Sequence, residues 1–362
     1  MRLPTLVSRR VFLRGLATGA AAAAFPTAHA RDTDLDRIIE ANRRYILDRQ
    51  LADGAIPDTH DLINPYFANI ATLGLLELPG QSRPARRWFD WYLAHLNRGS
   101  ANRWGLDATI YVYDLKNGVE TSRDTASNAD ANPATFLSAM WAFHRGGDAA
   151  DRDFVAAQRP TLQALARLMD ALADRDLTWD KPDYKVKYLI DNCQVFRGYL
   201  DYAQLLQLLG DGGEAARIAA RAEATRAAIT TQLWNDADRS FFYDRSEHGT
   251  PAPTDWRRWY RGNGAVSQLF PTLYGVLPPS DPRAIDLYQR FNGAFPDWPD
   301  LVKPNEEFAW ASVAYAAVLM GDRERARRYV DAVDRKIGAA GYRWPWHVEE
   351  SGWLLRAAVA LK

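Results

Sequence analysis

The sequence has little cysteine, no net charge and no long hydrophobic run. Cys193 is the only cysteine among 362 residues, so an internal disulfide is excluded and stability must come from a large apolar core. The 45 basic residues are balanced by 45 acidic ones, which leaves no net charge to attract nucleic acid or an anionic membrane. The longest apolar stretch, residues 15–25, is shorter than the roughly 20 residues that span a bilayer. We therefore expect a mature chain without a membrane span and without a nucleic-acid partner.

Motifs of several common chemistries are also missing. The six histidines lack the spacing of a zinc site, no glycine-rich phosphate loop opens a helix, and no serine lies in a nucleophile elbow. Cys193 lies in an apolar segment and is expected to be a small buried residue rather than a nucleophile. These absences predict a protein that uses neither a metal nor a cofactor.

The N-terminus has the three zones of an export signal. Residues 8–14 read Ser-Arg-Arg-Val-Phe-Leu-Arg, the modestly apolar run 15–25 follows, and residues 28–30 form the small-residue site Ala-His-Ala. The pattern predicts a twin-arginine signal peptide over 1–30, cleaved before Arg31, and a periplasmic or secreted protein. An uncleaved N-terminal helix is the alternative. We expect 31–362 to form a single catalytic domain.

Aromatic residues are plentiful, with 13 Trp, 16 Tyr and 14 Phe in the chain. Many of them lie between the segments that read as helices. Rings in such loops can pack beneath the connections, and rings beside a cleft can stack on the flat faces of sugars.

Apolar residues recur at helical spacing along the whole mature chain. Two short stretches, 109–113 and 240–243, read instead as strands of small hairpins. The predicted helical segments are 33–50, 65–77, 82–97, 132–145, 151–174, 190–209, 213–234, 263–275, 281–293, 306–319, 322–337 and 349–361.

The predicted helices alternate between two kinds. Odd-numbered segments such as 322–337 are amphipathic and charged, so one face must meet water, whereas even-numbered segments such as 306–319 are apolar all round. Outer and inner helices joined in six hairpins can close into a ring that covers every apolar face. We therefore predict an all-α (α/α)6 barrel, with an open solenoid of helix pairs as the alternative.

Polar residues gather where the inner segments begin. Such residues are common at any helix start as caps and as partners of the helix dipole. Capping does not, however, require doubled acids such as Glu306-Glu307 and Glu349-Glu350, or aromatics among them. We therefore expect the inner N-terminal ends to share one rim of the barrel and to form a cleft.

The residues resemble the six-hairpin glycosidases, which include glucoamylases, trehalases and unsaturated glucuronyl hydrolases. Residues 130–137, Asp-Ala-Asn-Pro-Ala-Thr-Phe-Leu, are similar to the start of an inner helix in this superfamily, and 187–192, Lys-Tyr-Leu-Ile-Asp-Asn, to the catalytic-helix start of glucuronyl hydrolases. Residues 305–310, Asn-Glu-Glu-Phe-Ala-Trp, are similar to the segment near the catalytic base of trehalases. The glycine-rich trehalase segment and a clear glucoamylase acid are missing, so no subfamily's substrate carries over. The resemblance implies a carbohydrate substrate.

Glycoside hydrolysis needs an acid to protonate the leaving oxygen and a carboxylate to activate water or attack carbon. In a six-fold ring of inner helices, the fourth predicted segment faces the tenth, and the sixth faces the twelfth. Asp130 can then oppose Glu306 or Glu307, and Asp191 can oppose Glu349 or Glu350. We predict Asp191 as the acid, because its apolar setting would raise its pKa, and Glu306 or Glu349 as the base. A wide separation across the barrel favours inversion.

The candidate substrate-binding residues flank these carboxylates or lie in aromatic loops. They are His60, Asp61, Asn64, Trp104, Tyr111, Tyr188, Asn192, Trp256, Tyr260, Arg261, Asn263, Trp344 and His347. Two other functions remain open. A lyase acting on a uronic-acid polymer would use a Tyr or His base, and a non-catalytic glycan-binding or assembly protein would use the rim acids only as caps.

Overall fold

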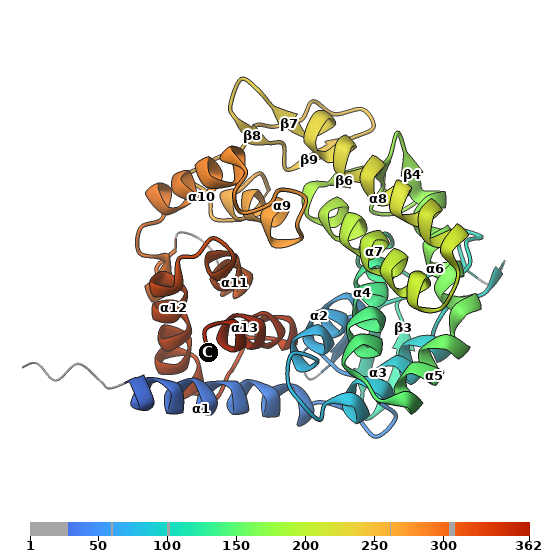
Figure 1. The fold of residues 1–362 in the computed structure, drawn as a ribbon, viewed down its shortest axis with the longest axis horizontal. Coiled ribbons are helices and arrows are strands. Elements are labelled where there is room, and N and C mark those ends of the chain that lie inside the picture. The colour runs from blue at the N-terminus through green and yellow to red at the C-terminus, as the bar shows by residue number, and fades with distance from the viewer. Residues whose placement is uncertain (1–27, 59–60, 100–101, 261, 304–307) are drawn as a thin grey trace, which may run out of the picture.

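The computed structural model describes residues 28–58, 61–99, 102–260, 262–303 and 308–362. Helices alternate along the chain between an outer and an inner layer (Figure 1). The outer helices are α1 (Ala28–Leu47), α3 (Ser82–Ala94), α5 (Ala149–Ala157), α6 (Arg159–Leu172), α8 (Gly212–Gln232), α10 (Pro282–Ala294) and α12 (Arg323–Lys336). The inner helices are α2 (Pro65–Leu75), α4 (Ala131–Gly146), α7 (Leu189–Leu208), α9 (Phe270–Leu273), α11 (Ser312–Leu319) and α13 (Val348–Ala360).

The inner helices form a closed ring. Each contacts the next in the order α2, α4, α7, α9, α11 and α13, and α13 packs back against α2 (Figure 1). The predicted (α/α)6 barrel is therefore confirmed, and the open solenoid is excluded because the first and last inner helices are in contact.

Close backbone approach seals this ring where α2 meets α13. Gly74 and Gly352 face each other, and a Cβ added to Gly74 would lie 2.4 Å from the carbonyl oxygen of Gly352. Any side chain at either position would force the two helices apart.

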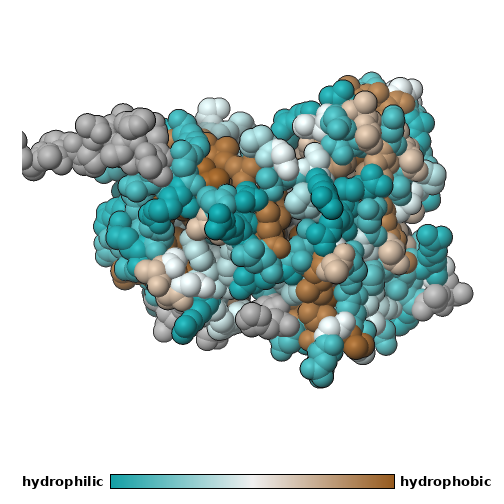
Figure 2. Space-filling model, turned by 90° about the horizontal axis from the view of Figure 1, so that it is seen from below, coloured by the Kyte–Doolittle hydropathy of each residue, from teal (hydrophilic) through white to brown (hydrophobic). Residues whose placement is uncertain are grey.

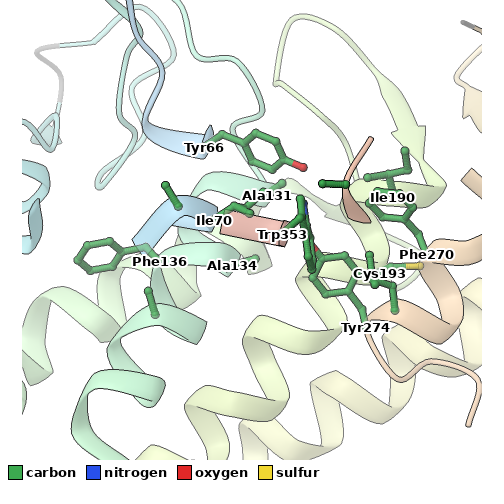
Figure 3. Close-up of a cluster of buried hydrophobic side chains, with 14 of the residues drawn as sticks. Tyr66, Ile70, Ala131, Ala134, Phe136, Ile190, Cys193, Phe270, Tyr274 and Trp353 are labelled. Atoms are coloured by element: carbon green, nitrogen blue, oxygen red, sulfur yellow. The ribbon is translucent and has the colours of Figure 1, made fainter. Parts of the chain in front are cut away.

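The two layers differ in polarity as the sequence predicts. On α12, Ala326, Tyr329, Val330 and Val333 are buried and the charged residues lie on the other face. Figure 2, a view from the side of α1, shows a mostly hydrophilic surface with hydrophobic patches between the polar groups. In the interior, Tyr66 of α2, Cys193 of α7 and Trp353 of α13 belong to one hydrophobic cluster, and Cys193 is fully buried (Figure 3). Among the described residues, none of the helices has the length and apolarity needed to cross a membrane.

Three predicted segments differ in detail. Segment 151–174 is two helices, α5 and α6, because Pro160 fits only the first turn of a helix and starts a new one. Segment 263–275 is a 3-10 turn, η2 (Ala265–Leu269), followed by the short α9, where Pro271 lacks the N–H that a continuous helix needs. Helix α11 begins only at Ser312, because Trp310 has a left-handed backbone with φ 57°.

Small antiparallel strand pairs lie in the loops. Strand β2 (Tyr113–Lys116) pairs with β3 (Val119–Ser122) and with β1 (Leu62–Ile63), so the first hairpin is confirmed but begins at Tyr113 rather than at 109. The others are β4 (Ala173–Asp174) with β5 (Leu177–Thr178), β6 (Val186–Tyr188) with β9 (Asp244–Ser246), and β7 (Trp234–Asn235) with β8 (Ser240–Phe241). The chain is completed by the 3-10 turns η3 (Trp298–Asp300) and η4 (Gly338–Ala340).

Candidate active site

The N-terminal ends of the inner helices meet at one cavity of about 410 Å³. Each inner helix contributes residues from its first turns or from the segment just before it, as the alternating topology predicts. The lining consists of Tyr66, Phe67, Ser127, Asn128, Asp180, Lys181, Tyr184, Tyr188, Ile190, Asp191, Tyr243, Tyr260, Phe270, Phe308, Trp310, Ser312, His347, Glu349, Glu350 and Trp353.

Three buried carboxylates cluster on one side of this cavity. Asp130, Asp180 and Asp191 each place an oxygen within 4.8 Å of the other two. Asp191 and Asp180 line the cavity and Asp130 lies behind them, fully buried. The Nζ of Lys181 lies 3.3 Å from the Asp180 carboxylate.

Asp191 does not cap its own helix. It lies in the first turn of α7, and its Oδ2 accepts a hydrogen bond of 3.1 Å from the amide of Asn128. The N-cap of α7 is Tyr188, which makes no side-chain capping bond. Asp130 is different, because its carboxylate accepts a hydrogen bond from the N–H of Ala131 at 2.8 Å and caps α4. Capping therefore explains Asp130 but leaves Asp191 free for another role.

The carboxylate cluster holds protons near neutral pH. Burial and the nearby carboxylates Asp130 and Asp180 hold the pKa of Asp191 well above its ordinary value. Burial, reinforced by Asp180, raises the pKa of Asp130 to about 7, and burial raises that of Asp180 to about 6 although Lys181 opposes it. Because like charges this close disfavour full ionisation, the raised pKa of Asp191 favours the protonated form of the carboxyl that faces the cavity.

The same three carboxylates are the described residues best placed to hold a cation. Hard cations take six or more oxygen ligands, and the Lys181 ammonium already lies beside Asp180. Bound protons and the Lys181 ammonium therefore suffice to balance the negative charge of the three carboxylates without a metal. The expectation that the protein uses no metal stays a prediction.

Glu349 lies on α13, which faces α7 across the ring. Its carboxylate accepts a hydrogen bond of 3.3 Å from the indole N–H of Trp353 and lies 3.7 Å from the Nε2 of His347. Burial would lower the pKa of His347, but its contacts with Glu349 and Glu350 raise it above the ordinary value. Glu349 is thus held in place by Trp353 and lies beside His347 on the wall opposite Asp191.

Glu350 has a positional role. It is 3% exposed, and its two carboxylate oxygens accept hydrogen bonds from the N–H groups of Trp310 at 2.7 Å and Ala311 at 2.6 Å. These bonds fix the left-handed turn before α11 that directs Trp310 into the cavity. Glu350 is therefore a positioning residue for the aromatic wall.

That wall is a continuous row of five rings, the aromatic arc: Tyr184, Tyr188, Tyr243, Tyr260 and Trp310. The hydroxyls of Tyr184 and Tyr188 lie 3.1 Å apart, as do those of Tyr243 and Tyr260. The rings of Tyr260 and Trp310 have centroids 3.9 Å apart. Flat rings with polar tips suit a ligand that has both apolar faces and hydroxyl groups.

Of the sequence candidates, Asp191, Tyr188, Tyr260, His347 and Glu349 line the cavity. His60, Arg261, Glu306 and Glu307 lie outside the described residues.

The polar candidates that do not line the cavity have local structural partners. Asn64 caps α2 through the N–H of Tyr66, and the buried Asn192 accepts the N–H of Thr178 at 2.8 Å. The amide of Asn263 donates to the carbonyl of Pro253, and Asp61 is exposed.

The loop aromatics expected as platforms are mostly elsewhere. Trp104 packs on the small cluster of Ala126, Ala129, Leu168 and Leu172, and Tyr111 is buried beside it. Arg290 stacks on Trp256, with 4.2 Å from its guanidinium carbon to the ring centroid. Trp344 is exposed and does not line the cavity, although its ring contacts the rings of two lining residues, Phe308 and His347. Trp104, Tyr111 and Trp256 therefore pack beneath the long connections, which is the alternative that their loop positions left open.

Glutamine at position 350 tests the positional role. Glu350→Gln turns one acceptor into an N–H₂ donor, so one buried backbone N–H loses its partner, at a cost of about 1–3 kcal/mol in the free energy of unfolding. We expect denaturant unfolding to show this loss, and KM to rise several-fold with a smaller change in kcat. The exposed Glu324→Gln is the control. An unchanged KM would contradict the role in shaping the site.

The carboxylate cluster should also make stability depend on pH. The folded-state pKa of Asp130 is about 7, against about 3.9 in an unfolded chain, so its contribution is complete below pH 4 and is lost as the pH rises towards 7. Asp130→Asn should flatten this part of the curve of unfolding free energy against pH, whereas the exposed Asp153→Asn should not. Parallel curves for wild type and Asp130→Asn would contradict the assignment.

No family model matches the sequence, and neither does any curated protein. Solved structures do match in three dimensions. A glycosidase variant in complex with glucose aligns with a TM-score of 0.64 at 14% identity, over 93% of this chain and 99% of the other. A rhamnosidase from Klebsiella oxytoca with rhamnose bound has a TM-score of 0.58 at 12% identity, over 89% of this chain and 64% of that one. A β-1,3-1,4-glucanase from Paenibacillus sp. X4 has a TM-score of 0.56 at 12% identity, over 94% and 95% of the two chains. At these identities, what the chain shares with the three proteins is a glycosidase-like fold.

Proposed function

We propose that the protein is a glycoside hydrolase in which Asp191 is the general acid and Glu349 the general base. The observation that carries this proposal is that Asp191 on α7, a buried carboxyl with a raised pKa, and Glu349 on the facing helix α13 line one cavity. The names of the structural neighbours, glycosidase, rhamnosidase and glucanase, support the same reaction class.

In the proposed reaction, the Asp191 carboxyl donates its proton to the glycosidic oxygen while the bond from that oxygen to the anomeric carbon breaks. Glu349 takes a proton from a water molecule whose oxygen attacks the anomeric carbon. One C–O bond is broken and one C–O bond is formed, while one proton passes from Asp191 to the leaving oxygen and one from water to Glu349. Solvent then returns both carboxyl groups to their starting protonation states. The carboxylate cluster keeps Asp191 protonated for the next turnover.

We further propose an inverting mechanism. The two carboxyl groups come from helices on opposite sides of the ring, and inverting enzymes separate theirs by roughly 6.5–9.5 Å to leave room for the water. Proton NMR of the first product should show the anomer opposite to that of the substrate. A product with the substrate's anomeric configuration would instead indicate that Glu349 is a nucleophile.

The substrate we propose is an oligosaccharide or the end of a polysaccharide, with sugar rings stacked on the aromatic arc. The three zones of the N-terminal segment support the further proposal that residues 1–30 direct twin-arginine export and are removed, leaving 31–362 as the catalytic domain.

A substrate screen tests the function. The purified mature protein is incubated with aryl glycosides and polysaccharides, and both reducing ends and ultraviolet absorbance are recorded. Hydrolysis releases reducing ends without an absorbing product. An unsaturated, ultraviolet-absorbing product would establish a lyase instead, and binding without turnover would establish a glycan-binding protein.

A further inference from the structure

A second cavity, of about 420 Å³, lies behind one wall of the candidate active site. The wall is formed by the segment 179–188 and strand β9. Neighbouring residues divide between the two cavities: Asp180, Tyr184 and Tyr188 line the first, whereas Trp179, Lys185 and Lys187 line the second. One segment therefore serves both cavities. Within β6 the neighbouring side chains of Lys187 and Tyr188 point to opposite faces, as in any strand.

The second cavity is rich in cationic groups. Four of its lining side chains are basic (Arg175, Lys185, Lys187 and Arg245), against two acidic ones (Asp174 and Glu247).

Both acids are already paired with lysines. The Nζ of Lys187 lies 2.7 Å from the Asp174 carboxylate, and the Nζ of Lys185 lies 2.8 Å from Glu247. The Nε of Arg175 is 3.7 Å from Asp174, so Arg175 shares the Asp174 carboxylate with Lys187. Arg245 has no ion-pair partner among the described residues.

The strand register places two of these cations together. Lys187 on β6 is directly opposite Arg245 on β9, an arrangement of like charges that destabilises a strand pair. The Lys187 side chain is only 4% exposed, and its Nζ lies 4.2 Å from the centroid of the Trp179 ring. Burial lowers the pKa of Lys187, the bond to Asp174 opposes this, and Arg175 and Arg245 lower it further.

We infer that this second cavity binds an oxyanion, namely a sulfate, phosphate or carboxylate group, held by Arg175 and Arg245. A guanidinium group presents two parallel N–H donors that match such an anion. Four basic against two acidic side chains in the lining leave the cavity with an excess of positive charge. The anion is either a free inorganic ion or a substituent on a sugar, in which case the sugar ring lies beside the half-buried Trp179 of the cavity lining. This site is separate from the proposed catalytic pair and does not depend on it.

Calorimetric titration of the mature protein tests the inference. Sodium sulfate is titrated at low ionic strength, because salt screens exposed charges, with sodium chloride of equal ionic strength as the blank. Arg175→Gln/Arg245→Gln should lower sulfate affinity at least tenfold. The control is Arg239→Gln/Arg257→Gln, which removes two exposed arginines that line neither cavity and loses the same charge. Circular dichroism checks that all variants fold.

Two further ligands identify the source of the anion. A sulfated oligosaccharide that binds more tightly than inorganic sulfate points to a substituted sugar, and equal affinities point to a free ion; both results support an oxyanion site. The inference is overturned if wild-type protein does not bind sulfate, if the Arg175/Arg245 variant binds as wild type does, or if the unsulfated oligosaccharide competes equally for the site. Glycoside hydrolysis is measured separately, so a failure of this site does not bear on the proposed reaction.

Discussion

Asp191→Asn is expected to lower kcat on an oligosaccharide by roughly 10²- to 10⁴-fold, the usual contribution of a positioned general acid. The amide cannot donate a proton to the leaving oxygen, although it keeps the shape of the side chain and its contact with Asn128. The thermal midpoint should not fall, because the substitution removes a buried carboxyl and no helix cap. Steady-state kinetics of the variant measure kcat, and thermal denaturation of the same preparation measures the midpoint.

The leaving group makes this test specific. In an aryl glycoside made from an acidic phenol, the phenolate leaves without being protonated. Asp191→Asn should therefore lose much less activity on that substrate than on a natural oligosaccharide. Asp153→Asn, exposed on α5, is the matched control and should be unaffected on both. Equal losses on the two substrates would show that Asp191 is not the acid, and full activity on both would exclude it from the chemistry.

Glu349→Gln is expected to lower kcat at least as much as Asp191→Asn does on an oligosaccharide. This loss in kcat should not depend on the leaving group. The base activates water whichever group departs, and a glutamine cannot accept the proton. The fold should persist, because the glutamine side chain can still accept the Trp353 hydrogen bond.

The same variant should change His347. Without the Glu349 carboxylate, one of the groups that raise the pKa of His347 is lost, and NMR titration of the imidazole should record a lower pKa. Glu324→Gln should leave both kinetics and titration unchanged. A Glu349→Gln loss that disappears on activated aryl glycosides would instead assign Glu349 the role of acid.

The fold could be predicted because its signal is periodic. Apolar residues all round segment 306–319 and charges on one face of 322–337 separate the inner helices from the outer ones. Exact starts could not be predicted where a tertiary contact overrides helix propensity. The Glu350 carboxylate holds Trp310 in a left-handed turn, and nothing near residue 310 in the sequence indicates this.

The site could be predicted only where it coincides with helix starts. Asp191 and Glu349 could be predicted as site residues because each is an acid near the start of an apolar inner segment. Asp180 was missed because Asp180-Lys181 reads as an exposed turn. It is buried because its N–H donates to Val186 and its carbonyl accepts from Ala129, two contacts made between loops. Tyr243 and Trp310 were missed as lining residues for the same reason, since pairing of β6 with β9 and the Glu350 contact bring them to the cavity.

The most direct test of the paired-carboxylate site is a crystal structure of the Asp191→Asn protein with a bound oligosaccharide. We expect the glycosidic oxygen within about 2.6–3.2 Å of the side chain at position 191, with a water between Glu349 and the anomeric carbon. Sugar rings should lie against Tyr260 and Trp310. An oligosaccharide bound away from these residues, or one whose glycosidic bond faces neither position 191 nor Glu349, would contradict the proposed catalytic pair.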